Sequence, residues 1–109
     1  MNGGYANVKI MNLPSKLTTI GKYSFRGNTG IQFTSIPNGV TVIEDLAFKW
    51  SSARITQFGG NNSKLTTVGK EAFKEAGVDR EAIENIYLGS TVKTLGNECF
   101  KAYGSLSGP

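Results

Sequence analysis

The stretch Leu65-Thr-Thr-Val-Gly-Lys-Glu-Ala-Phe73 decides the fold, because closely similar sequences occur at three other places in the chain. Each begins with an aliphatic residue, reaches a second aliphatic residue three positions later, and ends in phenylalanine eight positions after the first. The four segments are Leu17–Phe25, Val40–Phe48, Leu65–Phe73 and Val92–Phe100. Their starting points are separated by 23, 25 and 27 residues. Self-similarity at this period indicates a solenoid, in which each repeat buries its apolar side only against its neighbours.

A second apolar block precedes each of these segments, and the four blocks begin at Val8, Ile31, Ile55 and Ile83. Three of them end in Pro14, Pro37 or Gly89, residues that stop a strand. The sequence therefore predicts two short strands in each repeat. The glycine at the fifth position of the repeated segment, as in Gly69, predicts a bend into one helical turn that carries the phenylalanine. The run from Lys70 to Ala76, followed by Gly77, has the helix formers and the glycine stop of such a turn.

These patterns predict a solenoid: a short right-handed stack of about four repeats with small parallel sheets, turns and single helical turns. At 109 residues the chain suits one domain, 1–109. The length variation lies in the connections, where Gly59–Asn62 predicts a loop or bulge and Asp79 caps an added turn over 80–84. The expected repeats are approximately 8–30, 31–54, 55–82 and 83–103.

Composition excludes several kinds of chemistry. The chain has no histidine and one cysteine, Cys99, so disulfide scaffolds, cysteine-rich zinc sites and imidazole-based catalysis are excluded. Cys99 takes the place of a small packing residue before phenylalanine, and the acidic group Asp79, Glu81 and Glu84 matches no calcium-binding loop. We therefore expect no enzyme activity, no cofactor and no metal site. No apolar run is long enough to span a membrane, and the first residues lack the features of a signal peptide.

The four units together resemble the BspA-like (Treponema-type) leucine-rich repeat, whose pattern is L-x-x-I-x-I-P-x-x-V-T-x-I-G-x-x-A-F. Three units fit the pattern without a gap, Ile55–Phe73 needs one inserted residue, and the resemblance covers residues 8 to 103. It implies a leucine-rich-repeat solenoid of a kind found in bacterial surface or secreted proteins that bind molecules of a host or neighbouring cell, with no catalytic residue or cofactor. The family often has cysteine three residues after phenylalanine. In this chain those positions hold Asn28, Ser51, Ala76 and Tyr103.

The distribution of charge indicates candidate binding residues. The formal net charge is +4, and no acidic residue precedes Glu44. The residue after each repeat phenylalanine is basic: Arg26, Lys49, Lys74 and Lys101. Equivalent positions in a solenoid stack about 4.8 Å apart, so these cations would form a stripe. The stripe could bind an anionic polymer, or it could be a solvated surface, with nearby glutamates such as Glu71, Glu75 and Glu98 offsetting part of the charge.

Aromatic residues outside the phenylalanine series are candidates for an exposed contact patch: Tyr5, Tyr23, Trp50, Tyr87 and Tyr103. Trp50 is the only tryptophan and suits an anchor in an interface, although it could equally cover the end of the phenylalanine series. Aromatic residues are not interleaved with the cations in the way that base stacking requires, which disfavours nucleic acid.

The sequence thus predicts a non-enzymatic interaction module of a bacterial cell-surface or secreted protein, which binds a protein or an anionic glycan. The candidate ligand-binding residues are Arg26, Lys49, Trp50, Lys74 and Lys101. The alternative is a purely structural repeat spacer without a ligand of its own. We also expect that the ends of the stack could associate with other copies, because solenoids need polar caps.

Overall fold

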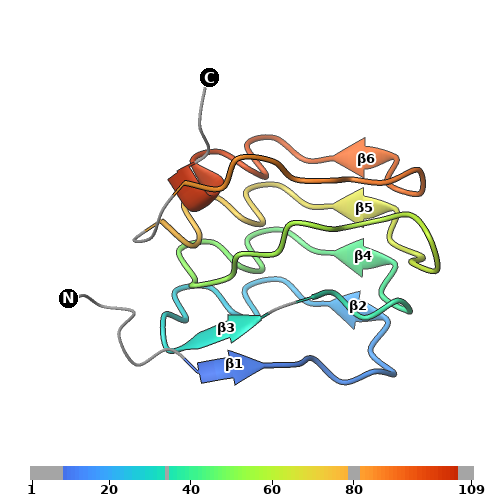
Figure 1. Ribbon diagram of the computed structural model, residues 1–109, viewed down its shortest axis with the longest axis horizontal. Coiled ribbons are helices and arrows are strands. Elements are labelled where there is room, and N and C mark those ends of the chain that lie inside the picture. The colour runs from blue at the N-terminus through green and yellow to red at the C-terminus, as the bar shows by residue number, and fades with distance from the viewer. Residues whose placement is uncertain (1–8, 34, 79–81, 106–109) are drawn as a thin grey trace.

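The computed structural model describes residues 9–33, 35–78 and 82–105, in which the chain winds into a stack of coils (Figure 1). Tyr5, Val8, Asp79 and Glu81 lie outside these residues, and with them the start of the turn predicted over 80–84, whose described residues 82–84 are not helical. One side of the stack is a parallel sheet whose strands lie in the order β2-β4-β5-β6. Each strand comes from a different repeat. They are β2 (Thr19–Ile20), β4 (Val42–Ile43), β5 (Thr67–Val68) and β6 (Thr94–Leu95).

The register of this sheet follows the repeats. Ile20 lies beside Ile43, Ile43 beside Val68, and Val68 beside Leu95. The first three of these aliphatic side chains are buried at 2% exposure or less, whereas Leu95, on the edge strand β6, is 46% exposed. Each strand is only two residues long, so the sheet depends on repetition from coil to coil and on the packing of the side chains beneath it.

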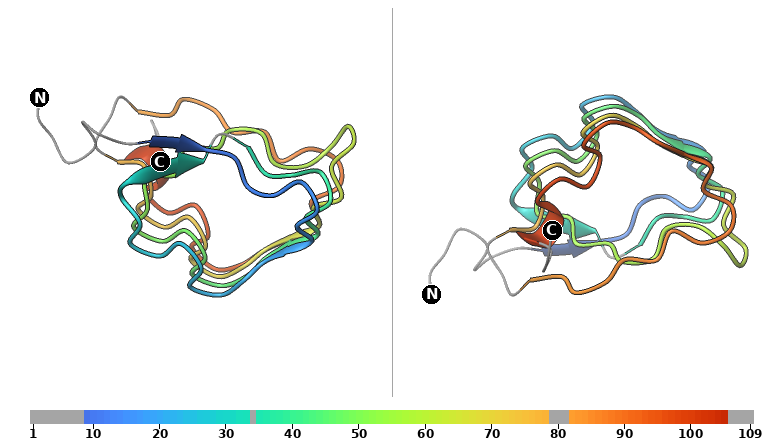
Figure 2. Two further views of the ribbon diagram at one scale, coloured as in Figure 1. Left: turned by 90° about the horizontal axis from the view of Figure 1, so that it is seen from below. Right: turned by 90° about the horizontal axis from the view of Figure 1, so that it is seen from above.

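A second, smaller sheet lies on another side of the coil (Figure 2). Its parallel strands are β1 (Lys9–Met11) and β3 (Ile31–Phe33), and in the later repeats the same position holds a single bridge between Gln57 and Tyr87. The loop that the sequence predicted at Gly59–Asn62 follows this bridge. The backbones are also very close at this point: a Cβ atom on Gly89, whose φ is +79°, would lie 2.1 Å from the carbonyl carbon of Gly59.

The segment that carries each phenylalanine is a pair of tight turns, which corrects the predicted helical turn. In the first repeat the N–H groups of Ser24 and Arg26 donate to the carbonyls of Gly21 and Tyr23, at 3.1 and 3.2 Å. Between these bonds, alternate N–H groups donate to the next coil, as from Phe25 to the carbonyl of Ala47 (2.8 Å). A helix would instead use the N–H groups within its own segment. Among the described residues, the single helical segment is the short 3₁₀ turn η1 (Tyr103–Ser105).

The repeat phenylalanines stack in a column through the core, as their common position predicted. Successive ring centroids are 5.1 Å apart from Phe25 to Phe48, 4.8 Å from Phe48 to Phe73, and 5.7 Å from Phe73 to Phe100, with the planes within 19° of parallel. The two central rings are fully buried, and the two end rings are partly exposed. The column therefore ties all four repeats into one core.

Tyr103 closes part of this column, and its prediction as an exposed contact residue is wrong. Its side chain is fully buried, its ring lies 5.1 Å from that of Phe73, and its hydroxyl donates to the carbonyl of Ile55 (2.7 Å). Burial also raises the pKa of this hydroxyl. Cys99 is buried as well, and burial raises the pKa of its thiol, as expected for a packing residue.

Candidate ligand-binding face

The paired turns of the four repeats together make one surface, which we call the turn face: residues 22–27, 45–50, 70–75 and 97–102. Two backbone positions on it have positive φ in every repeat. The first of these positions holds Tyr23, Leu46, Glu71 and Glu98, and the second holds Gly27, Trp50, Glu75 and Ala102. A residue with a Cβ atom pays about 1 kcal/mol or more in this conformation, whereas glycine adopts it freely. The residues other than glycine at these positions therefore adopt this conformation at an energetic cost.

The structure places the four predicted cations in one row on the turn face. The N–H of Gly27 donates to the carbonyl of Lys49 (2.8 Å), that of Trp50 to Lys74 (3.0 Å), and that of Glu75 to Lys101 (2.9 Å). These bonds connect successive coils at the residues that carry, or directly follow, the cations. Arg26, Lys49, Lys74 and Lys101 therefore occupy equivalent positions in successive coils.

Glutamates interleave the last three cations of this row. The Nζ of Lys49 lies 2.6 Å from Oε1 of Glu71, and the Nζ of Lys74 lies 2.8 Å from Oε1 of Glu98. Weaker pairs join Lys74 to Glu71 at 4.0 Å and Lys101 to Glu98 at 3.7 Å. The hydrogen bonds from Lys49 and Lys74 hold the pKa of Glu71 and of Glu98 below the usual 4.5. The stripe is therefore largely neutralised beyond its first member.

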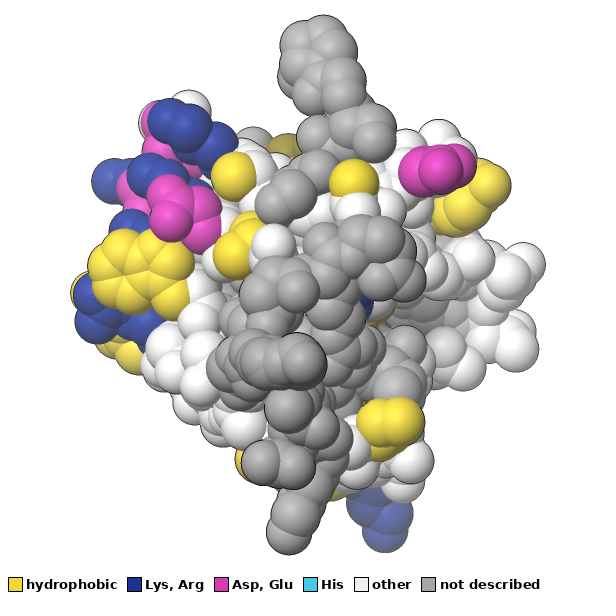
Figure 3. Space-filling view, turned by 60° about the vertical axis from the view of Figure 1, so that its left-hand side comes forward, with side chains coloured by type: hydrophobic (Ala, Val, Ile, Leu, Met, Phe, Trp, Pro, Cys, Tyr) yellow, Lys and Arg dark blue, Asp and Glu magenta, His cyan; other side chains and the backbone are white. Residues whose placement is uncertain are grey.

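Arg26 is different, because it lies against aromatic rings. Its guanidinium carbon is 4.8 Å from the centroid of the Trp50 ring and 5.7 Å from that of Tyr23, and the Nζ of Lys49 lies 4.4 Å from the Trp50 ring. Trp50 is 43% exposed and Tyr23 is 53% exposed. Trp50 thus belongs to a cluster of cations and aromatic rings on the surface. Figure 3 shows apolar side chains beside basic and acidic ones along one edge of the molecule.

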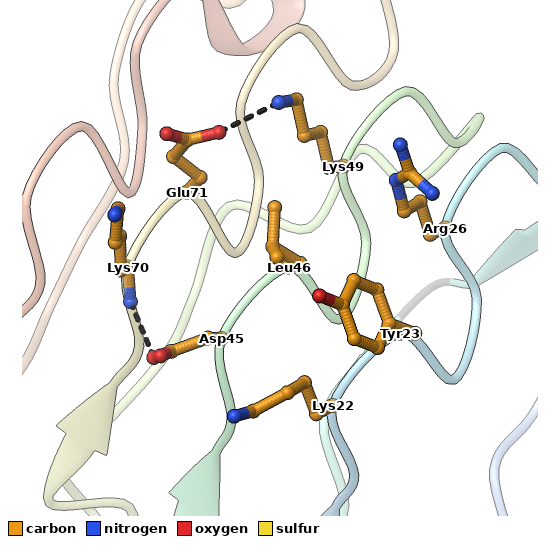
Figure 4. Close-up of a pocket in the computed structure, with 8 residues that line it drawn as sticks. All are labelled: Lys22, Tyr23, Arg26, Asp45, Leu46, Lys49, Lys70 and Glu71. Carbon is orange, nitrogen blue, oxygen red and sulfur yellow. Dashed lines mark hydrogen bonds and ion pairs between the residues drawn. The ribbon is translucent and has the colours of Figure 1, made fainter.

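A hollow of about 400 Å³ opens beside this cluster (Figure 4). Three coils contribute to its lining, which consists of Lys22, Tyr23, Arg26, Asp45, Leu46, Lys49, Lys70 and Glu71. Sequence reasoning had assigned Arg26 and Lys49 to a binding site but had not placed Lys22, Asp45 or Lys70 there. The sequence nevertheless held a sign that these three residues lie together. Each of them stands three residues before a repeat phenylalanine, so stacking brings them side by side.

A second hollow, of about 520 Å³, lies over the bridge between Gln57 and Tyr87 on the opposite part of the coil. Tyr87 is 63% exposed, as the sequence predicted, but charged side chains are absent from the described residues that line this hollow. The turn face is therefore the stronger candidate for a binding site, because charged side chains line its hollow.

Among residues 9–33, 35–78 and 82–105, no three histidine, cysteine or acidic side chains gather as metal ligands would. In the same residues the structure contains no helix of the length and apolar character needed to cross a membrane. What the turn face offers chemically is charge, hydrogen-bond donors and aromatic surface.

Stacked coils with two-residue parallel strands and a central phenylalanine column define a repeat solenoid. The family model described as "BspA type Leucine rich repeat region (6 copies)" matches residues 4–108, so the chain belongs to the BspA-type leucine-rich repeat family. Repeats of this family are typically non-enzymatic interaction modules, and the family suggests extracellular or surface proteins. No curated protein and no solved structure matches the chain.

Proposed function

We propose that this protein is an interaction module of a bacterial cell-surface or secreted protein, and that its turn face binds a ligand on a host or neighbouring cell. Of the two ligand classes that the sequence favoured, protein and glycan, an acidic glycan agrees best with the turn face. Sugar rings have apolar C–H faces that pack on aromatic rings, and their acidic groups pair with arginine and lysine.

The observation that carries this proposal is the setting of Trp50. Its φ is +62°, and the equivalent residue in the preceding coil is Gly27, which has the same type of backbone conformation without a side chain. Glycine would therefore relieve strain at position 50. The indole is instead held out beside Arg26 and Lys49, partly exposed. Strained residues of this kind cluster at functional sites, which supports a contact role for Trp50.

One feature of the C-terminal end of the stack, at the edge strand β6, supports the alternative role of a structural spacer. Leu95 is 46% exposed on the edge strand β6. Among the described residues, the N–H groups of Glu98 and Phe100 have no acceptor, whereas the equivalent groups of Glu71 and Phe73 donate to the next coil. A further coil would use these donors and cover Leu95, so the edge suits stacking as well.

The substitution Trp50→Gly separates the two functions. We expect the wild-type protein to be retained on an immobilised acidic polysaccharide, such as a heparin-type column, at low salt. Trp50→Gly should lose most of this retention without a lower melting temperature, because glycine favours the local backbone. Ala102→Gly is the matched control, since it makes the same backbone change at the equivalent position, where φ is +55° and no aromatic ring is lost.

Equal retention of Trp50→Gly and wild type would contradict a role for the aromatic cluster. The structural-spacer role would be favoured if the wild-type protein assembles through its ends but binds no acidic polysaccharide, no neutral polysaccharide and no protein ligand.

A further inference from the structure

The hollow on the turn face has the form of a site for one anionic group. Figure 4 shows Lys22, Asp45 and Lys70 along one side and Arg26 and Lys49 along the other, with Leu46 between the two rows. Its volume of about 400 Å³ is in the range of small-ligand sites. The stacking of three coils creates it, because the three coils supply Lys22, Asp45 and Lys70 to the first row and the first two of them supply Arg26 and Lys49 to the second.

The lining of the hollow carries an excess of positive charge. Four cations and two carboxylates line it, which leaves a formal charge of +2. Both carboxylates already have partners: Oε1 of Glu71 pairs with Lys49 at 2.6 Å, and Oδ1 of Asp45 accepts the backbone N–H of Lys70 at 2.9 Å. The hollow therefore attracts anions in spite of its two acidic residues.

Three of its cations have no carboxylate partner among the residues that the structure describes: the side chains of Lys22, Arg26 and Lys70. Arg26 is also the most constrained of the three, because its guanidinium lies between Trp50 and Tyr23. A guanidinium held on aromatic rings keeps its N–H donors and loses less side-chain entropy when it binds a planar or tetrahedral oxyanion.

The remaining lining is apolar. Leu46 lies between the two cationic rows at a φ of +64°, and the half-exposed ring of Tyr23 lies beside it. An acidic peptide would need only the charges, whereas a sugar ring also uses an apolar floor next to them. This combination favours a polysaccharide over an acidic polypeptide.

We infer that the hollow lined by Lys22, Arg26 and Lys70 binds a single carboxylate or sulfate group of an acidic polysaccharide, with the sugar ring against Tyr23 and Leu46. This inference rests on the proposed function, since it names the group that the module recognises. It places the centre of binding at the N-terminal end of the turn face, where Lys22, Arg26 and Lys70 have no carboxylate partner among the described residues, and away from Lys74 and Lys101, which pair with Glu98.

Binding is measured by titrating fluorescently labelled protein with three polysaccharides and one polypeptide at low salt. Hyaluronan carries carboxylates only, dextran sulfate carries sulfates only, heparin carries both, and poly-L-glutamate tests the peptide alternative. Each exposed charge pair contributes up to about fivefold in affinity, so Lys22→Gln/Arg26→Gln should weaken binding by about tenfold.

Lys64→Gln/Lys93→Gln is the matched control. It removes the same two positive charges from exposed residues that do not line the hollow, and its affinity should stay within about twofold of wild type. Asp45→Asn gives an opposite test. It keeps an oxygen to accept the N–H of Lys70 but removes the negative charge, so it should tighten binding by about threefold.

The outcomes separate this inference from the proposed function. If the polysaccharides bind but the Lys22/Arg26 variant and its control weaken equally, the hollow is not the site, although the module still binds glycans. If poly-L-glutamate binds as tightly as the polysaccharides and depends on Lys22 and Arg26, the anion site stands and the glycan assignment is wrong. If none of the four polymers binds, this inference and the choice of an acidic glycan as the ligand are both wrong, whereas the interaction module itself fails only if it also binds no neutral polysaccharide and no protein ligand. Preference for hyaluronan or for dextran sulfate identifies the carboxylate or the sulfate as the bound group.

Discussion

Truncation of Phe48 to alanine is the most direct test of the core, and we expect it to cost about 5 kcal/mol in the free energy of unfolding. The ring is fully buried and is stacked on both faces, 5.1 Å from Phe25 and 4.8 Å from Phe73. A third ring, Phe33, meets its edge at 5.4 Å. Truncation therefore leaves a cavity with aromatic walls on three sides, which the surrounding coils cannot close without breaking the strand register.

The magnitude follows from this geometry. Removing a buried phenylalanine side chain costs about 3–5 kcal/mol, and the upper end applies where the site cannot collapse. Phe25 is the internal comparison, because it is partly exposed and, among the described residues, has one parallel stacking partner, Phe48, with Phe33 tilted against it at 4.4 Å. We expect Phe25→Ala to cost about 3 kcal/mol. A domain of this size is stable by about 5–15 kcal/mol, so Phe48→Ala should be close to unfolding.

Guanidinium unfolding followed by circular dichroism measures both costs, with unchanged slopes as the control for two-state behaviour. If Phe48→Ala loses less than about 2 kcal/mol, or if Phe25→Ala is the more damaging change, the rings do not form the continuous column described above, and the assignment of the repeat phenylalanines to the core is refuted.

Three further predictions concern the cap, the strained turns and the ion pairs. Tyr103→Phe should cost about 1–2 kcal/mol, because the buried carbonyl of Ile55 loses its donor, and an unchanged melting temperature would contradict that role. Glu75→Gly should stabilise the protein by about 1 kcal/mol, since φ is +55° there, and a loss of stability in denaturant unfolding would show that the turn is not strained. The pKa values of Glu71 and Glu98 are lowered, so the stability they contribute is complete above pH 4.5 and is lost as the pH falls through their folded pKa values. Melting temperatures from pH 7 to pH 3 should show this loss, and Glu71→Gln/Glu98→Gln should lack it.

The spacing of the repeats was sufficient to predict the stack. Because equivalent residues of a solenoid must meet their counterparts in adjacent coils, the common positions of Phe48 and Phe73 implied stacked rings, and those of Ile43 and Val68 implied neighbouring strands. The loop at Gly59–Asn62 also followed from local composition. These are features that one repeat pattern determines by itself.

The conformation of the turns did not follow from composition. The residues from Lys70 to Ala76 are good helix formers, yet they form tight turns with positive φ at Glu71 and Glu75. Helix propensity amounts to a few tenths of a kcal/mol per residue and is easily overridden. Here the N–H of Phe73 donates to the carbonyl of Cys99 in the next coil, a bond that a helical segment would have to give up.

The amino-acid sequence by itself determined the family, the register of the repeats and the row of cations after the phenylalanines. Only the tertiary structure decided which groups lie against each of these cations. Lys49 and Lys74 pair with glutamates from the following coil, whereas Arg26 lies against aromatic rings. The hollow could not be predicted from the sequence either, because Lys22 and Lys70 belong to different repeats and approach one another only when the coils stack. Charge pairing depends on distances of a few ångströms, and in a solenoid the contacts between coils set those distances.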